Sequence, residues 1–482
     1  MKTPHPLVAL IPLIALILFL ATAILLFGSD SLNGGSQTAL ILGMAVCIII
    51  SMTCYKTPWK TFERQISRTL GDISITILIL LAVGMISGSW MLSGVVPTLI
   101  CYGIQIMSPQ FFLVSSCLIC AIVSLLSGSS WTTIATIGVA LMGIGTALGI
   151  SEAWTAGAII SGAYFGDKMS PLSDTTILAS SAVGTDLFTH IRYMTLTTTP
   201  TFLITLTIFL IAGLGNTDLS PLQINQYTEG LTSTFHITPL TLIVPLLTGI
   251  LIALRLPSLI TLFSSAILAG ITALILQPHI LTQVSLDATS LPDSYPAWTH
   301  LVSGLAVTFY GATHIDTGTP SLNELISTGG MAGMLNTIWL ILTAMCFGAV
   351  MVASRMIESV TNLILSFARG RLSLVTTTAG TGLFLNLTTG DQFISIVLTA
   401  DMYREAYRQQ GFEPRLLSRT AEDAATVTSV LIPWNTCGMT QSTVLGVPTL
   451  VYLPYCFFNY LSPLMTILVA AIGWKIKQHK PL

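Results

Sequence analysis

Apolar runs of membrane-spanning length recur along this chain and constrain its fold more than any other feature. Residues 7–27, 73–93, 193–214 and 451–474 are examples. About 20 consecutive apolar residues form a helix that is long enough to cross the hydrocarbon core of a bilayer. Helices suit this environment because they satisfy their own backbone polar groups in lipid. The sequence therefore predicts an all-α polytopic membrane protein.

The composition supports the same class. Only 8% of the 482 residues are charged, whereas soluble domains carry about 25%. The first apolar run, after Lys2, has features of a signal peptide, but the many later spans favour an uncleaved helix. The eight cysteines lie in or beside apolar segments without histidine partners, which is typical of buried hydrophobic residues. We expect no cofactor and no nucleic-acid partner.

The distribution of basic residues predicts the orientation in the membrane. A single topology places 17 of the 18 Lys and Arg residues on one side. The loops at 215–236 and 278–333 contain none. Because positive residues stay cytoplasmic, both termini are expected in the cytoplasm. Lys168 is the exception.

Two segments are predicted to be re-entrant hairpins. Residues 110–149 carry two apolar arms without basic flanks, so both ends are expected outside. Residues 372–401 carry two shorter arms with basic flanks, so both ends are expected inside. Each segment bends at a polar sequence, "LSGSSWTT" or "LTTGDQF". Together with these hairpins, we expect about 10 crossing helices.

The hairpins indicate an internal repeat. Gly128 and Gly390 at the bends are 262 residues apart, as are Pro171 and Pro433. Paired repeats of inverted topology with broken helices are a transporter architecture, with the substrate near the interface of the repeats. The predicted units are a helical hairpin at 1–54, a first repeat at 73–214, a linking helix pair at 236–277, an outer loop region at 278–333 and a second repeat at 335–476.

Polar residues gather at the bends and at the prolines, which break helices. Charged residues inside spans mark function by default, so Asp174 and Asp391 are predicted to bind Na⁺ or H⁺. Oxygen ligands without imidazole or thiolate suit hard cations, of which sodium is the abundant one. The full predicted cation and proton site consists of Asp167, Asp174, Asp391, Ser129, Ser130, Ser173, Thr175, Thr389, Asn435 and Thr436.

Structural roles explain some of these residues equally well. Asp167 and Lys168 fit an ion pair at a helix end. Glu422 and Asp423 are interpreted as the solvated end of the second broken helix. Any single hydroxyl can serve helix packing alone.

The stretch "SGAYFGDKMSPLSDTT" with "AVGTDLFTHIRYM" resembles the signature of the NhaC family of sodium/proton antiporters. "SGSSWTTIATIGVALMGIG" and "LSRTAEDAATVTSVLIPWNTCG" are also similar to that family. The resemblance extends over most of residues 70–475. It implies a secondary antiporter of the bacterial cytoplasmic (inner) membrane. The family also includes antiporters that exchange sodium and protons for organic acids such as malate and lactate.

The leading hypothesis is therefore exchange of Na⁺ for H⁺ by alternating access. Coupled exchange of an organic anion is the alternative, and its pocket would draw on Lys168, Asn386 and Asn435. An intramembrane serine protease is disfavoured because no histidine lies in a hairpin or broken helix to serve as general base. A passive channel is disfavoured by the inverted repeats. Homo-oligomerisation stays open.

Overall fold

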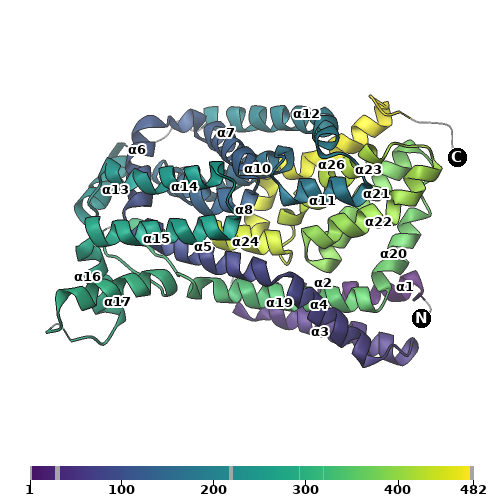
Figure 1. Ribbon diagram of the computed structural model, residues 1–482, viewed down its shortest axis with the longest axis horizontal. Coiled ribbons are helices and arrows are strands. Elements are labelled where there is room, and N and C mark those ends of the chain that lie inside the picture. The colour runs from purple at the N-terminus through teal and green to yellow at the C-terminus, as the bar shows by residue number, and fades with distance from the viewer. Residues whose placement is uncertain (1–2, 28–32, 216–220, 293, 319, 478–482) are drawn as a thin grey trace.

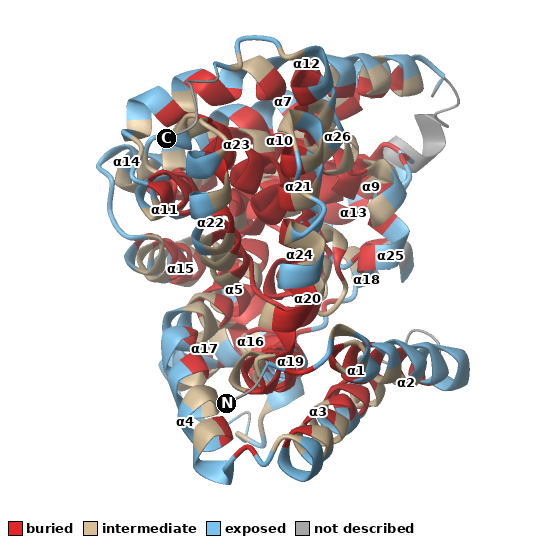
Figure 2. Cartoon of the chain, turned by 90° about the vertical axis from the view of Figure 1, so that its right-hand side faces the viewer, coloured by how far each residue is buried: buried red, intermediate tan, exposed pale blue. Residues whose placement is uncertain are grey.

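The computed structural model describes residues 3–27, 33–215, 221–292, 294–318 and 320–477. Over these ranges the chain is helical, with a single isolated β-bridge between Thr313 and Thr328. Most of the labelled helices run along the long axis of the molecule (Figure 1). Figure 2, turned by 90°, shows buried residues concentrated around α10, α21 and α24, with exposed residues on the outer helices.

Membrane-spanning helices dominate this architecture. Within the described ranges, eight helices are long and apolar enough to cross a bilayer, and two bent pairs raise the number to ten. Large apolar side chains such as Leu25 and Ile106 are 85% and 81% exposed on the outer surface. In water that exposure would cost free energy, whereas lipid removes the penalty. The prediction of an all-α polytopic membrane protein is confirmed.

The helices before and between the proposed repeats have the following bounds. The N-terminal part contains α1 (Pro6–Ala9), α2 (Ile11–Phe27), α3 (Gly35–Cys54) and α4 (Trp59–Asp72). The middle part contains α13 (Pro221–Thr234), η3 (Pro239–Leu242), α14 (Ile243–Ala253), α15 (Ser258–Leu276), α16 (Pro278–Ala288), α17 (Ala297–Tyr310), α18 (Pro320–Ile326) and η4 (Ala332–Met334). Residues 278–333 were expected to be an outer loop region, and the structure places the short helices α16, α17 and α18 within them.

The remaining helices form two series. The first contains α5 (Ser74–Leu92), α6 (Val95–Ile106), α7 (Pro109–Ser127), α8 (Ser130–Thr133), η2 (Ile134–Gly138), α9 (Val139–Ala147), α10 (Glu152–Met169), α11 (Asp174–Val183) and α12 (Leu187–Leu214). The second contains α19 (Leu335–Ala353), α20 (Met356–Leu365), α21 (Arg371–Thr389), α22 (Gln392–Gln409), α23 (Pro414–Ala421), η5 (Glu422–Thr426), η6 (Ser429–Leu431), α24 (Thr436–Leu445), α25 (Thr449–Tyr452), η7 (Leu453–Tyr455) and α26 (Phe457–Ile472).

The helix bounds of the two series agree at the offset of 262. Helices α7 and α21 begin and end 262 residues apart, as do α11 and α24. The α8–α9 arm, residues 130–147, corresponds to α22, residues 392–409, at the same offset. Figure 1 places both chain ends at one end of the molecule and α16 and α17 at the other. The sequence indicated the repeat through the two hairpins and the spacing of glycines and prolines, so this agreement of whole helices is independent support for it.

Each hairpin bend packs against the helix break of its own series. Gly128 and Gly390 end α7 and α21 in the left-handed conformation, with φ of 68° and 70°. A Cβ on Gly128 would lie 2.7 Å from the backbone carbonyl carbon of Leu172, and one on Gly390 would lie 3.4 Å from the carbonyl oxygen of Trp434. Leu172 and Trp434, at the two breaks, are again 262 residues apart.

The two breaks leave fewer free carbonyls than the prolines suggest. The sequence predicts that Pro171 leaves the carbonyl of Asp167 unpaired, and that Pro433 does the same for Ser429. Instead, the Asp167 carbonyl accepts the N–H of Ser170 at 3.0 Å, and the Ser429 carbonyl accepts that of Ile432 at 3.3 Å. The chain tightens at each break, so these carbonyls have partners within the turn.

Helix α10 is held close to α7 by small residues. A Cβ on Gly162 would lie 2.1 Å from the carbonyl oxygen of Cys117, and one on Gly166 would lie 2.3 Å from that of Ala121. Small residues allow helix backbones to approach closely in membranes. This packing brings the C-terminal end of α10, with Asp167, to the bend of the first hairpin.

We expect Gly128→Ala to destabilise the protein more than Gly184→Ala. Both glycines have positive φ, 68° and 74°, which costs an L-residue about 1–2 kcal/mol. The Cβ at position 184 meets nothing within 4 Å, whereas the one at position 128 overlaps the backbone of Leu172. Thermal unfolding of the purified variants measures the difference. Equal losses of Tm would show that the bend does not need close contact with the break.

Candidate functional site

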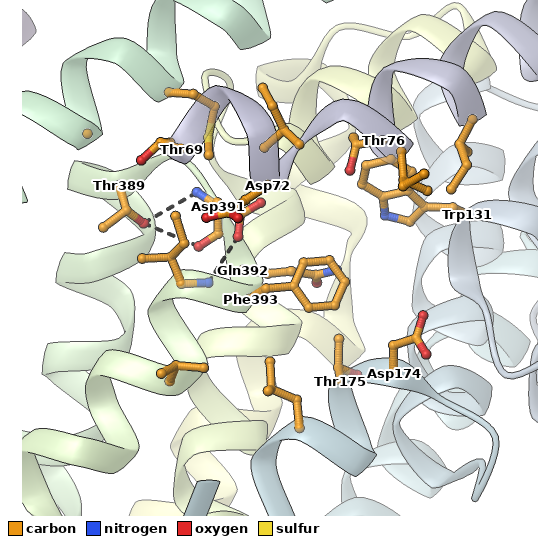
Figure 3. Close-up of a pocket in the computed structure, with 18 of the residues that line it drawn as sticks. Thr69, Asp72, Thr76, Trp131, Asp174, Thr175, Thr389, Asp391, Gln392 and Phe393 are labelled. Atoms are coloured by element: carbon orange, nitrogen blue, oxygen red, sulfur yellow. Dashed lines mark hydrogen bonds between the residues drawn. The ribbon is translucent and has the colours of Figure 1, made fainter. Parts of the chain in front are cut away.

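A cavity of about 720 Å³ is lined by residues of both hairpin bends and of the first helix break. Its lining comes from both series and from α4, and Figure 3 shows part of it. In this view Asp391 and Asp174 lie on different sides of the space, with Phe393 and Trp131 also directed toward it. Cavities of this size are typical of sites for small molecules.

Asp391 lies at the start of α22 and is held there by the helix itself. Its Oδ1 accepts the N–H of Ile394 at 3.0 Å, which makes Asp391 the N-cap. Its Oδ2 accepts the hydroxyl of Thr436 at 3.4 Å. The side chain is 6% exposed. The N-terminal end of a helix favours negative charge, so the fold fixes this carboxylate at the wall of the cavity.

Asp167 is the most strongly hydrogen-bonded carboxylate of the site. Its Oδ2 accepts the N–H of Ser130 at 3.0 Å and the hydroxyl of the same serine at 2.6 Å. Its Oδ1 accepts the hydroxyl of Ser173 at 2.5 Å. Asp167 therefore joins the end of α10 to the first hairpin and to the start of α11.

Asp174 differs from the other two carboxylates. Ser173, rather than Asp174, caps α11 by accepting the N–H of Thr176. Asp174 is exposed, lines the cavity and has no hydrogen-bond partner among the described residues. Its carboxylate is therefore free to contact whatever enters the cavity.

The cavity brings together seven of the ten predicted site residues. These are Ser129, Asp167, Ser173, Asp174, Thr175, Thr389 and Asp391. Ser130, Asn435 and Thr436 are not part of its lining and lie behind it. Ser130 and Thr436 donate to Asp167 and Asp391, respectively, while Asn435 caps α24 by accepting the N–H of Cys437 at 3.1 Å.

The charges around the cavity are mainly negative. Four carboxylates line it, those of Asp72, Asp167, Asp174 and Asp391. Arg68 of α4 is the single basic side chain in the lining that the structure describes. A surplus of carboxylates raises the local concentration of cations. The electrostatics of the cavity thus favour a cation over an anion.

A second polar cluster lies beside the cavity and was not predicted. Lys168 forms an ion pair with Asp423, and both side chains are completely buried. Asp423 also faces Arg419, whose Nε is 3.8 Å from its Oδ2. Glu422 is completely buried, and its Oε1 accepts the hydroxyl of Thr175 at 3.1 Å.

Two interpretations made from the sequence are therefore wrong. Lys168 pairs with Asp423 rather than with Asp167. Glu422 and Asp423 are buried rather than solvated. Lys168 was already the exception to the distribution of basic residues, and a buried lysine requires a carboxylate partner. The position of Lys168 in the sequence therefore predicts a carboxylate partner but does not identify that carboxylate.

Comparison with known proteins identifies the family. A model described as "Na+/H+ antiporter family" matches residues 5–182 and 162–474. The Na(+)/H(+) antiporter NhaC of Alkalihalophilus pseudofirmus is 38% identical over 446 residues, covering 91% of each chain. The arginine/ornithine antiporter ArcD of Halobacterium salinarum is 32% identical over 477 residues, covering 98% of this chain and 93% of the relative.

A third relative differs again in its substrates. The malate-2H(+)/Na(+)-lactate antiporter of Bacillus subtilis is 30% identical over 448 residues, covering 92% of this chain and 91% of the relative. The resemblance to the NhaC family is thereby confirmed. The three relatives are all named as antiporters, but their names give different substrates. The chain belongs to the Na⁺/H⁺ antiporter family and is a multi-pass secondary antiporter rather than an enzyme.

Proposed function

We propose that the protein exchanges Na⁺ for H⁺ across the cytoplasmic membrane by alternating access. The observation that carries this proposal is the cavity lined by both hairpin bends and the first break, with four carboxylates and one guanidinium in its lining. Asp391, Asp174 and Asp167 would bind either Na⁺ or H⁺. Hydroxyls of Ser129, Ser173, Thr175 and Thr389 would complete an oxygen shell, which is the ligand type that hard cations prefer.

The two helical series would move relative to each other as inverted repeats. Transporters of this kind open a midplane site to one side at a time. The lining extends to Arg68 of α4 and to Ser258 at the start of α15. The distribution of basic residues predicts that both lie on the cytoplasmic side. The described conformation would accordingly be open to the cytoplasm.

Transport in inverted membrane vesicles tests the function. A respiratory ΔpH is established, and Na⁺, Li⁺ or K⁺ is then added separately. We expect Na⁺ to dissipate the gradient in vesicles that contain the protein and not in vesicles that lack it. A gradient that is insensitive to every cation would contradict the proposal.

Exchange of an organic substrate is a second proposal, favoured by the size of the cavity, which exceeds the needs of a single ion. The charge of the lining disfavours an organic anion. Lys168, the cationic residue that such a substrate would require, pairs with Asp423 and does not line the cavity. Malate, lactate and arginine, added to the same vesicles, separate these alternatives.

The proposed orientation predicts that Gln409 faces the cytoplasm. Gln409 is exposed at the end of α22, next to Arg408. In a background with exposed Cys54 changed to serine, Gln409→Cys should react with an impermeant maleimide in inverted vesicles and stay unlabelled in intact cells. Labelling from outside intact cells would contradict the inverted topology.

A further inference from the structure

We propose that the buried Lys168–Asp423 ion pair is a positioning element of the cation site. It sets two neighbouring carboxylates, Asp167 and Glu422, against the first turn of α11. The inference rests on the proposed function, because it concerns the same cavity.

The ion pair connects the two helical series. Lys168 belongs to α10 of the first series and Asp423 to η5 of the second. The ammonium group of Lys168 also donates to the hydroxyl of Ser462 on α26 at 2.9 Å. Asp423 Oδ1 accepts the hydroxyl of Thr197 on α12 at 3.2 Å. Four segments therefore meet at one buried charge pair.

Each member of the pair directly follows a carboxylate that reaches α11. Asp167 precedes Lys168 and accepts the hydroxyl of Ser173 at 2.5 Å. Glu422 precedes Asp423 and accepts the hydroxyl of Thr175 at 3.1 Å. The hydroxyls of Ser173 and Thr175 are 2.9 Å apart. A continuous chain of polar contacts thus runs from Asp167 to Glu422.

Glu422 is held by fewer hydrogen bonds than Asp167, which accepts three. Helix α10 ends at Met169, one residue after Lys168, and the break follows. The Oε2 atom of Glu422 is buried without a hydrogen-bond partner among the described residues. Thr176 of α11 donates its hydroxyl to the backbone carbonyl of Lys168 at 3.0 Å. Anchoring Lys168 to Asp423 therefore holds the end of α10, the start of α11 and η5 in register.

Removing both charges together separates positioning from folding. Removing one partner leaves a buried uncompensated charge, whereas replacing both by apolar residues is often neutral for stability. We expect Lys168→Met and Asp423→Leu singly to lower the yield of folded protein. The double variant should have a higher Tm than either single variant, although buried Arg419 then loses its carboxylate neighbour Asp423. It should nevertheless raise the apparent KM for Na⁺ at least about tenfold in proteoliposomes, with a smaller change in kcat, because a misplaced site binds less well.

A matched control removes an ion pair outside the site. Arg408 and Glu405 pair on the exposed face of α22, with side chains 67% and 55% exposed. The double variant Arg408→Gln/Glu405→Gln should keep the KM for Na⁺. If the Lys168/Asp423 double variant recovers both stability and KM, the pair is purely structural and the proposal is wrong.

A milder variant covers the case in which the double variant does not fold. Ser462→Ala removes one hydrogen bond of Lys168 and one of Asp423, and leaves the ion pair in place. We expect it to fold normally and to raise the KM for Na⁺ several-fold. A folded Ser462→Ala variant with unchanged KM and unchanged hydrogen exchange at α11 would also overturn the proposal.

Hydrogen exchange measures the positioning without any substrate. The peptide that spans residues 166–178 includes the break and the first turn of α11. Its amides should exchange at least about tenfold faster in the double variant or, if that variant does not fold, measurably faster in Ser462→Ala. They should be unchanged in the control. If the unmodified protein shows no Na⁺-dependent transport, the proposed function fails, while this exchange measurement still decides the inference.

Discussion

Asp391→Asn should abolish Na⁺-dependent proton movement in inverted vesicles, with a loss of at least about a hundredfold. Asp391 is a buried carboxylate at the wall of the cavity. In the proposed complex Na⁺ and Asp391 form a buried ion pair. Removing one charged partner from such a pair costs about 3–5 kcal/mol, and each 1.4 kcal/mol corresponds to a factor of ten. Asparagine also caps helices well, so it can replace the bond to Ile394 N–H. The variant should therefore reach the membrane at normal levels.

Asp401→Asn on the same helix is the matched control. Asp401 pairs with Arg404 on the surface of α22, where its side chain is 55% exposed. This variant should transport normally, since exposed ion pairs contribute little. If Asp391→Asn is present in the membrane and exchanges Na⁺ for H⁺ as well as Asp401→Asn does, Asp391 is not part of the coupling site.

The arrangement of helices was largely predictable from the sequence because bilayers impose strong local rules. Apolar runs predicted the spans, and the predicted bends contain Gly128 and Gly390, which are left-handed in the structure. The helices within residues 278–333 were not foreseen from the sequence. They lack Lys and Arg and are partly polar, which is typical of an outer loop. However, α16 and α17 pack against each other, and such tertiary support for helices is not visible in local composition.

Residues of the site were predictable only where their immediate sequence context indicates their position in the fold. Asp391 directly follows Gly390, and Thr389 directly precedes it, and a glycine among polar residues inside an apolar segment marks a bend. Glu422 and Asp423 follow a segment with several arginines, so their sequence context is typical of a solvated helix end. Their burial depends on Lys168, which is 255 residues away from Asp423 in the chain. A single sequence carries no information on such a distant pairing.

The different surroundings of Asp167 and Asp174 were also beyond prediction. Both precede hydroxyl-rich stretches, and the sequence favoured Asp174 as the functional group. In the structure Asp167 is saturated by Ser130 and Ser173, while Asp174 is exposed to the cavity without a partner. Whether Ser173 or Asp174 caps α11 decides this difference, and the cap depends on the geometry of the break.

The apparent KM for Na⁺ should rise as the pH falls. Na⁺ binds to deprotonated carboxylates, so protons compete for the same oxygen atoms. Below the pKa of one competing group, the KM should increase about tenfold per pH unit, and more steeply when two groups titrate together. Rates of Na⁺-dependent proton movement, measured over a range of Na⁺ concentrations at several pH values, give this slope directly.

Asp174→Asn tests which carboxylates contribute to that slope. Asp174 lines the cavity and has no hydrogen-bond partner among the described residues, so a proton there competes directly with Na⁺. If Asp174 and Asp391 both titrate, the variant should retain some transport, and the slope of log KM against pH should fall from about two to about one. Glu152→Gln, at the exposed start of α10, should leave the slope unchanged. A KM that does not depend on pH in the unmodified protein would show that Na⁺ and H⁺ use separate sites, because direct competition for one set of carboxylates requires the slope.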